Sequence, residues 1–189
     1  MTTVSVEHLA RTYESVGDLI AEIRPEQWKE PTPCTEWNVR DVVRHLVGMD
    51  LVFAAMLEGG PRPERGADPL GDDPVRAYRA SSASLQTAFA RPGVLERSFR
   101  GPLGSATGAE RLQIRLYDLL AHGWDLAQAT GISVRLPEDL AEQALAFVQV
   151  QVSAQSRAGR FAEPQPVDET APAIDRLAAF LGRPVPPQL

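Results

Sequence analysis

Cysteine, long apolar runs and clusters of basic residues are all scarce in this sequence of 189 residues. The single cysteine, Cys34, excludes an intramolecular disulfide framework and suits a reducing compartment. No apolar stretch approaches the ~20 residues needed to cross a bilayer, and the N-terminus has no basic region followed by an apolar one. We therefore expect a cytoplasmic protein with no membrane partner.

Acidic side chains outnumber basic ones. The 25 Asp and Glu residues against 19 Lys and Arg residues give a formal net charge of -6, and no run of Lys or Arg occurs. This balance argues against a nucleic-acid partner. Because 43% of the residues are hydrophobic, the chain is able to bury a sizeable core, and we expect a single domain over residues 1–189.

Strand signals are nearly absent, whereas apolar residues recur at three- and four-residue spacings, as in amphipathic helices. The periodic segments predict helices over residues 6–23, 39–58, 75–90, 108–130, 137–152 and 173–181. Long connections rich in Pro and Gly separate some of them, and residues 59–74 are either a crossover or a lid. Residues 95–99 favour at most a weakly paired extended segment. The sequence thus predicts an all-α fold in which four long helices and short additional helices pack as a bundle.

Polar residues mark the beginnings of two predicted helices. Asn38 with Asp41, and Thr107 with Glu110, have the three-residue spacing of a capping box. Gly131 is placed to end the later helix in the left-handed conformation.

The segment 117–131 (YDLLAHGWDLAQATG) places an acid and an imidazole one helical turn apart. Asp118 and His122 project from nearly the same side of a helix, so a carboxylate oxygen and a ring nitrogen can converge. Taken alone, such a pair is usually a solvated ion pair, and a third ligand is needed to favour a metal site. Gly123 costs the helix ~1 kcal/mol relative to Ala. Its missing side chain indicates either a close neighbouring element or clearance around a ligand.

His45 is the third candidate ligand. It lies on the buried side of the second long helix, where a hydrogen-bonded core histidine is the ordinary alternative. Sites in helical bundles are built from inward-facing side chains of different helices. Three nitrogen and oxygen ligands without a thiolate are typical of a catalytic zinc site that keeps an open position. Nickel, iron or manganese would also accept this set.

Two further residues of the later helix, Arg115 and Asp125, are candidates to support the ligands or to orient a substrate. No separate general base can be named. Cys34 lies in the loop before the second helix, and we interpret it as a structural thiol rather than a nucleophile.

Three segments together carry a family resemblance: TPCTEWNVRDVVRHLVG (32–48), YDLLAHGWDLAQATG (117–131) and DRLAAFLGRPV (175–185). They resemble the metal-binding N-terminal domain of the mycothiol-dependent maleylpyruvate isomerases, within the DinB-like superfamily. The resemblance implies a DinB-like four-helix bundle and a divalent metal, typically zinc, held by His45, Asp118 and His122. The family acid is commonly glutamate, and Asp118 is one methylene shorter.

The resemblance also implies a thiol-dependent activity. The family's isomerases carry a further C-terminal domain that helps form the active site. The chain ends at Leu189 without room for it, so we do not expect maleylpyruvate isomerisation itself. A low-molecular-weight thiol such as mycothiol, held at a metal as thiolate, is a nucleophile toward a small-molecule substrate. The sequence therefore favours an S-transferase or isomerase.

Two other function classes remain open on the sequence alone. One is a non-catalytic metal-binding or interaction bundle, and the other is a hydrolase that uses metal-activated water. A homodimer is compatible with such a bundle, although the sequence shows no stripe of residues that marks an interface.

Overall fold

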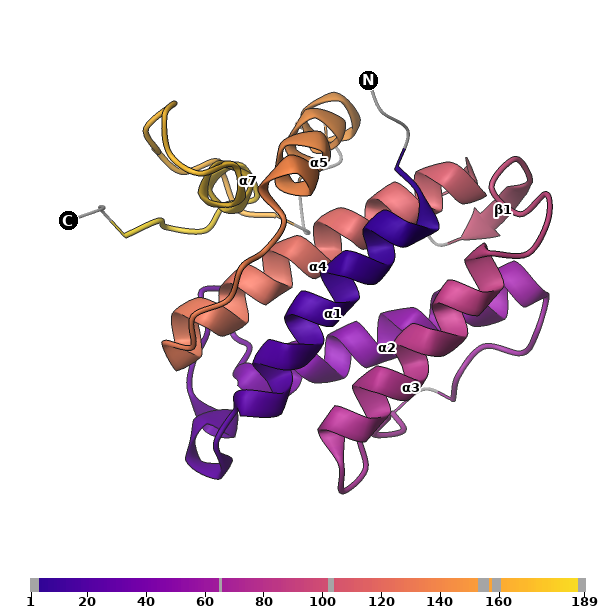
Figure 1. Cartoon of the computed structure of the whole chain (residues 1–189), viewed down its shortest axis with the longest axis horizontal. Helices are drawn as coiled ribbons and strands as arrows, with labels where there is room; N and C mark the ends of the chain where they lie inside the picture. The colour runs from indigo at the N-terminus through magenta and orange to yellow at the C-terminus, as the bar shows by residue number, and fades with distance from the viewer. Residues whose placement is uncertain (1–3, 65, 102–103, 153–156, 158–160, 187–189) are drawn as a thin grey trace.

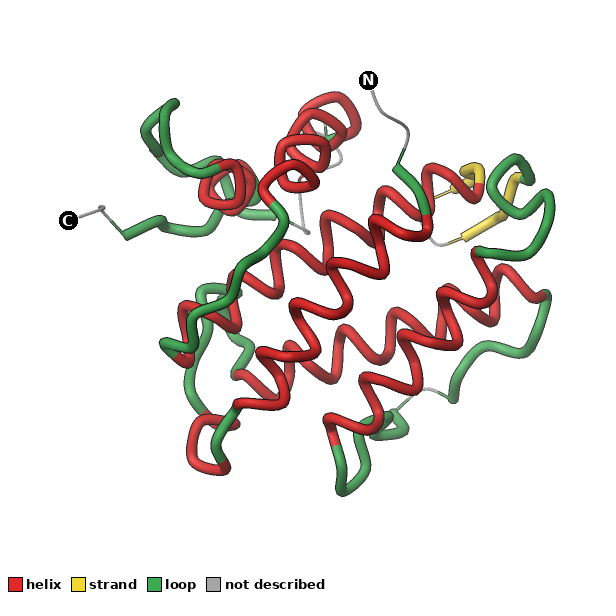
Figure 2. The backbone as a smooth tube through the Cα atoms, in the orientation of Figure 1, coloured by secondary structure: helices red, strands yellow, loops and turns green. Residues whose placement is uncertain are grey.

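The computed structural model describes residues 4–64, 66–101, 104–152, 157 and 161–186. Helices account for most of these residues, which confirms the prediction of an all-α fold (Figures 1 and 2). The long helices are α1 (Val6–Glu22), α2 (Val39–Glu58), α3 (Pro74–Phe89), α4 (Gly108–Thr130) and α5 (Glu138–Gln151). The short elements are η1 (Pro25–Lys29), a 3-10 turn, and α7 (Ala173–Phe180). Among the described residues, no helix combines the length and apolar character that crossing a bilayer requires.

The first four long helices form a bundle. Helix α1 packs against α3 and α4, and α2 packs against the same two helices (Figure 1). The order of the helices around the bundle is therefore α1, α3, α2 and α4. Helices α5 and α7 pack on each other and on α4, outside the bundle. Helix α4 is therefore covered on two sides, and much of its length is buried.

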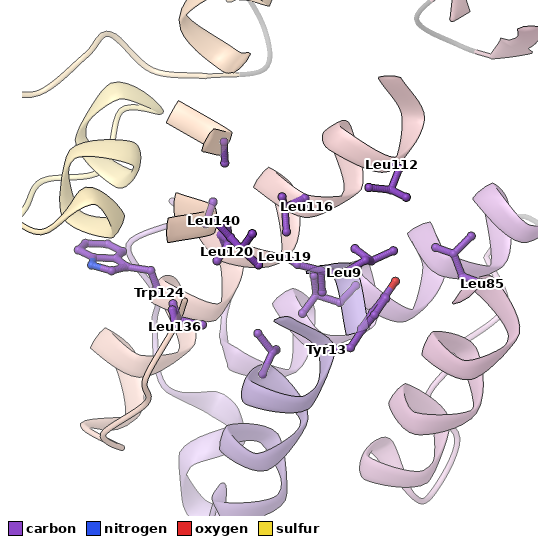
Figure 3. Packing of buried hydrophobic residues seen from close by; sticks show 14 of the residues in the cluster. Leu9, Tyr13, Leu85, Leu112, Leu116, Leu119, Leu120, Trp124, Leu136 and Leu140 are labelled. Atoms are coloured by element: carbon purple, nitrogen blue, oxygen red, sulfur yellow. The ribbon is translucent and has the colours of Figure 1, made fainter. Parts of the chain in front are cut away.

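Aliphatic side chains fill the centre of the bundle (Figure 3). Leu9 of α1, Leu112 and Leu116 of α4 and Leu85 of α3 belong to one buried cluster, and the ring of Tyr13, on α1, is part of it. All five side chains are at most 3% exposed. Burying an aliphatic side chain of this size contributes ~1.5–3 kcal/mol, so this layer is a main source of the bundle's stability.

A short hairpin precedes α4, and here the prediction of an extended segment at residues 95–99 was partly wrong. Strand β1 (Ser98–Gly101) pairs antiparallel with β2 (Gly104–Thr107), so the extended segment begins three residues later than predicted. Gly104 has a φ of 89°, a conformation that favours glycine, and the Arg111 side chain donates hydrogen bonds to the carbonyl oxygens of Phe99 and Gly104. Hydrophobic periodicity does not detect this backbone pairing or these side-chain hydrogen bonds.

The capping residues predicted for α2 and α4 are confirmed. The Asn38 side chain accepts a hydrogen bond from the Asp41 amide at 2.9 Å, and the Asp41 carboxylate accepts one from the Asn38 amide. Thr107 and Glu110 form the same reciprocal pair at the start of α4. Each capping box fixes where its helix begins, and hence which face of the helix points into the bundle.

Gly123 faces a neighbouring helix rather than a ligand. A Cβ atom at this position would lie 2.8 Å from Cγ2 of Val16 on α1 and 3.2 Å from Cδ2 of Leu136. Of the two explanations that the sequence left open, close approach by another element is the one that the structure supports.

We expect Gly123→Ala to lower the free energy of unfolding by about 1 kcal/mol, because overpacking of ~2 kcal/mol outweighs the ~1 kcal/mol gained in helix propensity. Gly48 of α2 is the matched control, since a Cβ there would meet no atom within 4 Å, and Gly48→Ala should raise stability by ~1 kcal/mol. Urea unfolding of both variants measures the difference. Equal stabilisation by the two substitutions would contradict the close-packing explanation.

Candidate metal centre

Three side chains from two helices converge at the predicted site. Nε2 of His45, on α2, lies 3.1 Å from Oδ1 of Asp118, on α4, and Nε2 of His122 lies 3.5 Å from the same oxygen. The three donor atoms all lie within 4.8 Å of one another. Around a tetrahedral zinc ion with bonds of ~2.0–2.1 Å, neighbouring donor atoms are ~3.3 Å apart. The spacing and the chemistry of this donor set therefore fit a divalent cation.

The three side chains line a cavity of about 610 Å³. Apolar side chains form much of its wall, including Met49, Phe53, Ile114 and Phe161. A second cavity, of about 770 Å³, shares Trp37, His45 and Met49 with the first, and residues of the 59–74 connection, such as Pro63 and Asp68, also line it. A small molecule held against the donor atoms would thus be partly removed from water.

Trp37 covers both imidazoles. Its ring stacks on that of His122, with centroids 5.7 Å apart and planes at 27°, and lies 4.9 Å from the ring of His45. The loop before α2 holds it there, because Thr32 donates hydrogen bonds from both its amide and its hydroxyl to the Trp37 carbonyl oxygen. The tryptophan restricts the rotation of both rings.

Asp125 holds His122 in one orientation. Its Oδ2 lies 3.0 Å from Nδ1 of His122, and a carboxylate accepts only, so Nδ1 carries the proton and Nε2 offers a lone pair to the site. Arg183, from beyond α7, donates to both oxygens of Asp125 at 3.2 and 2.9 Å. Burial would raise the pKa of Asp125, but these two partners hold it below its usual range.

Arg115 reaches Asp118 from inside the bundle. This guanidinium is fully buried, pairs with Asp50 at 2.8 Å, and contacts Oδ2 of Asp118. Burial would raise the pKa of Asp118, but the two histidines and Arg115 together hold it well below its usual range. Asp118 is therefore ionised, as a metal ligand must be.

The structure brings all five predicted site residues into one cluster: His45, Asp118 and His122 at the centre, with Arg115 and Asp125 beside them. Three further residues of the site, Asp50, Trp37 and Arg183, were not predicted from the sequence. Asp50 carried a signal, because it is an acid in the apolar stripe of α2, four residues after Leu46 and three before Phe53. Arg183 lies within the third family segment, 175–185, but nothing local indicated its partner.

Cys34 lines the same cavity, and its sulfur, with His122 and Asp125, forms a second group of donor atoms within 4.8 Å. This second group is poorly suited to a cation, because Arg183 already engages both oxygens of Asp125. Burial also raises the pKa of the Cys34 thiol to about 11, so at neutral pH the free thiol is not ionised and is a poor nucleophile.

Comparison with known proteins gives consistent matches. The family model described as the mycothiol maleylpyruvate isomerase N-terminal domain matches residues 9–127. Two uncharacterized proteins of Mycobacterium tuberculosis, from strains CDC 1551 / Oshkosh and ATCC 25618 / H37Rv, are each 37% identical over 177 residues, which cover 93% of this chain and 95% of theirs.

Among solved structures, the crystal structure of the mycothiol-dependent maleylpyruvate isomerase matches with a TM-score of 0.61 at 15% identity, over 77% of this chain and 71% of that chain. A histidine-to-alanine mutant of that isomerase gives the same TM-score at 14% identity and the same coverage. At this level of identity, the likeness shows that the fold is shared.

We expect Cys34 to react slowly with iodoacetamide at neutral pH, and its alkylation rate to rise about tenfold per pH unit between about pH 7 and 9.5 without a plateau, because only the thiolate reacts. Mass spectrometry follows the rate at this single cysteine. In urea the same thiol should level off near its ordinary pKa of ~8.5. A plateau near pH 8.5 in the folded protein would contradict the raised pKa.

Proposed function

This chain belongs to the family of the mycothiol maleylpyruvate isomerase N-terminal domain, and we propose that it is a metal-dependent protein that activates a low-molecular-weight thiol such as mycothiol. His45, Asp118 and His122 would hold a divalent cation, with zinc as the first choice. The observation that carries this proposal is the convergence of three donor atoms, from α2 and α4, on one cavity. Three ligands leave a position for the thiol sulfur.

A bound cation would supply one thing, the stabilisation of the thiol as thiolate at neutral pH. The protein's own residues do the rest. Asp125 keeps Nε2 of His122 directed at the cavity, and Trp37 limits the access of water to both imidazoles. The apolar wall, including Met49 and Phe161, would accommodate the carbon skeleton of an electrophile.

The reaction class that fits is transfer of the thiol to an electron-poor carbon. In an addition, the sulfur bonds to one carbon of an activated double bond, and the proton goes to the neighbouring carbon. If the added thiol stays, the protein is an S-transferase. If bond rotation is followed by loss of the thiol and the proton, the product is an isomer of the substrate and the thiol is regenerated.

The ligand assignment is tested by His45→Ala, in protein purified without a metal-affinity tag. We expect wild-type protein to carry about one equivalent of metal by elemental analysis and His45→Ala to carry almost none, because two ligands remain. Far-UV circular dichroism should show nearly unchanged helix content.

His8→Ala is the matched control. His8 belongs to α1, where its Nδ1 accepts the Ser5 amide at the helix cap, so its loss should reduce stability slightly and leave the metal in place. Stoichiometric metal in His45→Ala would show that the ligands are misassigned.

The thiol chemistry is tested with zinc-loaded wild-type protein and mycothiol. We expect calorimetric binding of the thiol to loaded wild-type protein and none to His45→Ala treated in the same way. A panel of activated alkenes and alkyl halides then measures the consumption of thiol against the uncatalysed rate. Binding without acceleration would identify a non-catalytic metal-binding protein, and absence of thiol binding would rule out the proposed chemistry.

A further inference from the structure

Asp50 is the centre of a buried network that joins all four helices of the bundle. Its Oδ1 accepts hydrogen bonds from Nε of Arg115, on α4, at 2.8 Å and from the hydroxyl of Tyr13, on α1. Its Oδ2 accepts one from the hydroxyl of Ser81, on α3, at 2.8 Å. Asp50 and Arg115 are both 0% exposed. Both oxygens of this carboxylate thus accept hydrogen bonds, and donors from the three other helices fix its position.

Arg115 connects this hydrogen-bond network to the candidate metal centre. Its Nη2 donates to the carbonyl oxygen of Leu46 at 2.9 Å, and its Nε is taken by Asp50. Nη1 is the nitrogen that contacts Asp118, at Oδ2. The other oxygen, Oδ1, is the one that lies 3.1 Å from Nε2 of His45.

We propose that Asp50 is a positioning residue for the metal centre, and that Tyr13 and Ser81 act with it. By holding Arg115 at Nε, it limits Arg115 to one oxygen of Asp118 and leaves Oδ1 as the single ligand atom of that carboxylate. This inference rests on the proposed function, because it assumes that His45, Asp118 and His122 bind a cation.

The physical reason lies in how a guanidinium pairs with carboxylates. An arginine with one anionic partner tends to bind both of its oxygens. Here the charge of Arg115 is shared between Asp50 and Asp118. If Asp50 were neutral, Asp118 would be the sole anion in contact with Arg115 among the described residues, and the guanidinium would compete with a cation for it.

A purely structural role would not explain the arrangement as well. A buried ion pair is often no more stabilising than apolar residues of the same volume, so Asp50 and Arg115 are not needed merely to fill the bundle. What the pair adds is a guanidinium held in one position, whose remaining nitrogen, Nη1, contacts the candidate ligand Asp118.

The test compares zinc affinity, by competition with a chromophoric chelator, and the visible absorption of the cobalt-loaded protein. Asp50→Asn should weaken zinc binding by about 10- to 100-fold, as outer-sphere substitutions typically do, and should change the cobalt spectrum. Tyr13→Phe and Ser81→Ala each remove one hydrogen bond to Asp50 and keep its charge, so we expect smaller losses of affinity in the same direction.

Leu140→Ala is the control for lost stability, because Leu140 is fully buried on α5 and belongs to the apolar core. It should lower the melting temperature and leave zinc affinity within twofold of wild type. If Asp50→Asn does not fold, Tyr13→Phe and Ser81→Ala decide the question.

Zinc affinity and cobalt spectra like those of wild type in the folded network variants would overturn this inference and leave the ligand assignment intact. An equal loss of affinity in Leu140→Ala would also overturn it, by showing that the loss follows general destabilisation. Wild-type protein that binds no zinc or cobalt would overturn the proposed function and this inference together.

Discussion

The buried ion pair between Arg115 and Asp50 constrains how the four helices of the bundle meet beside the candidate metal centre. Taking two charges out of water is expensive, and the expense is offset only if the remaining hydrogen-bonding groups find partners. The main chain of Leu46 and the hydroxyls of Tyr13 and Ser81 provide them. Because these partners belong to different helices, the pair has one favourable arrangement of the bundle, and that arrangement brings α2 and α4 together with their histidines facing each other.

Outward from this pair, acidic side chains alternate with arginine and histidine side chains. Asp50 is followed by Arg115, Arg115 by Asp118, and Asp118 by the two imidazoles. On the far side, His122 is followed by Asp125 and then Arg183. Asp118 lies beside the two histidines and Arg115, and Asp125 lies beside His122 and Arg183. Burial alone would raise the pKa values of these two carboxyls, but these partners hold both low. The arrangement keeps both carboxylates ionised within the protein.

Local features of the sequence predicted the helices, their caps and the pairing of Asp118 with His122, because each depends on residues a few positions apart. His45, 73 residues from Asp118, was added because it lies on the buried side of its helix and matches the family pattern. Asn38 with Asp41 begins α2, and Asp118 with His122 shares one face of α4. The sequence could not reveal that Tyr13 and Ser81 meet Asp50, since 37 and 31 residues separate them. The neighbours of Gly123 and the arginine partner of Asp125 could not be predicted for the same reason. The hairpin is local, pairing Ser98 with Thr107 and Gly101 with Gly104, but strands of four residues carry too little periodicity to place their ends. Periodicity gives the buried face of a helix, but not the side chain that faces it.

The contact between Arg183 and Asp125 ties the end of the described chain to the middle of α4. Helix α7 packs on α5 and α4 and buries Ala173, Leu177, Ala178 and Ala179, and this packing places Arg183 beside Asp125. If Arg183 were displaced, Asp125 would be a buried anion whose remaining side-chain partner, among the described residues, is His122. The orientation of His122, a candidate ligand, thus depends in part on an arginine 58 residues beyond Asp125 in the sequence.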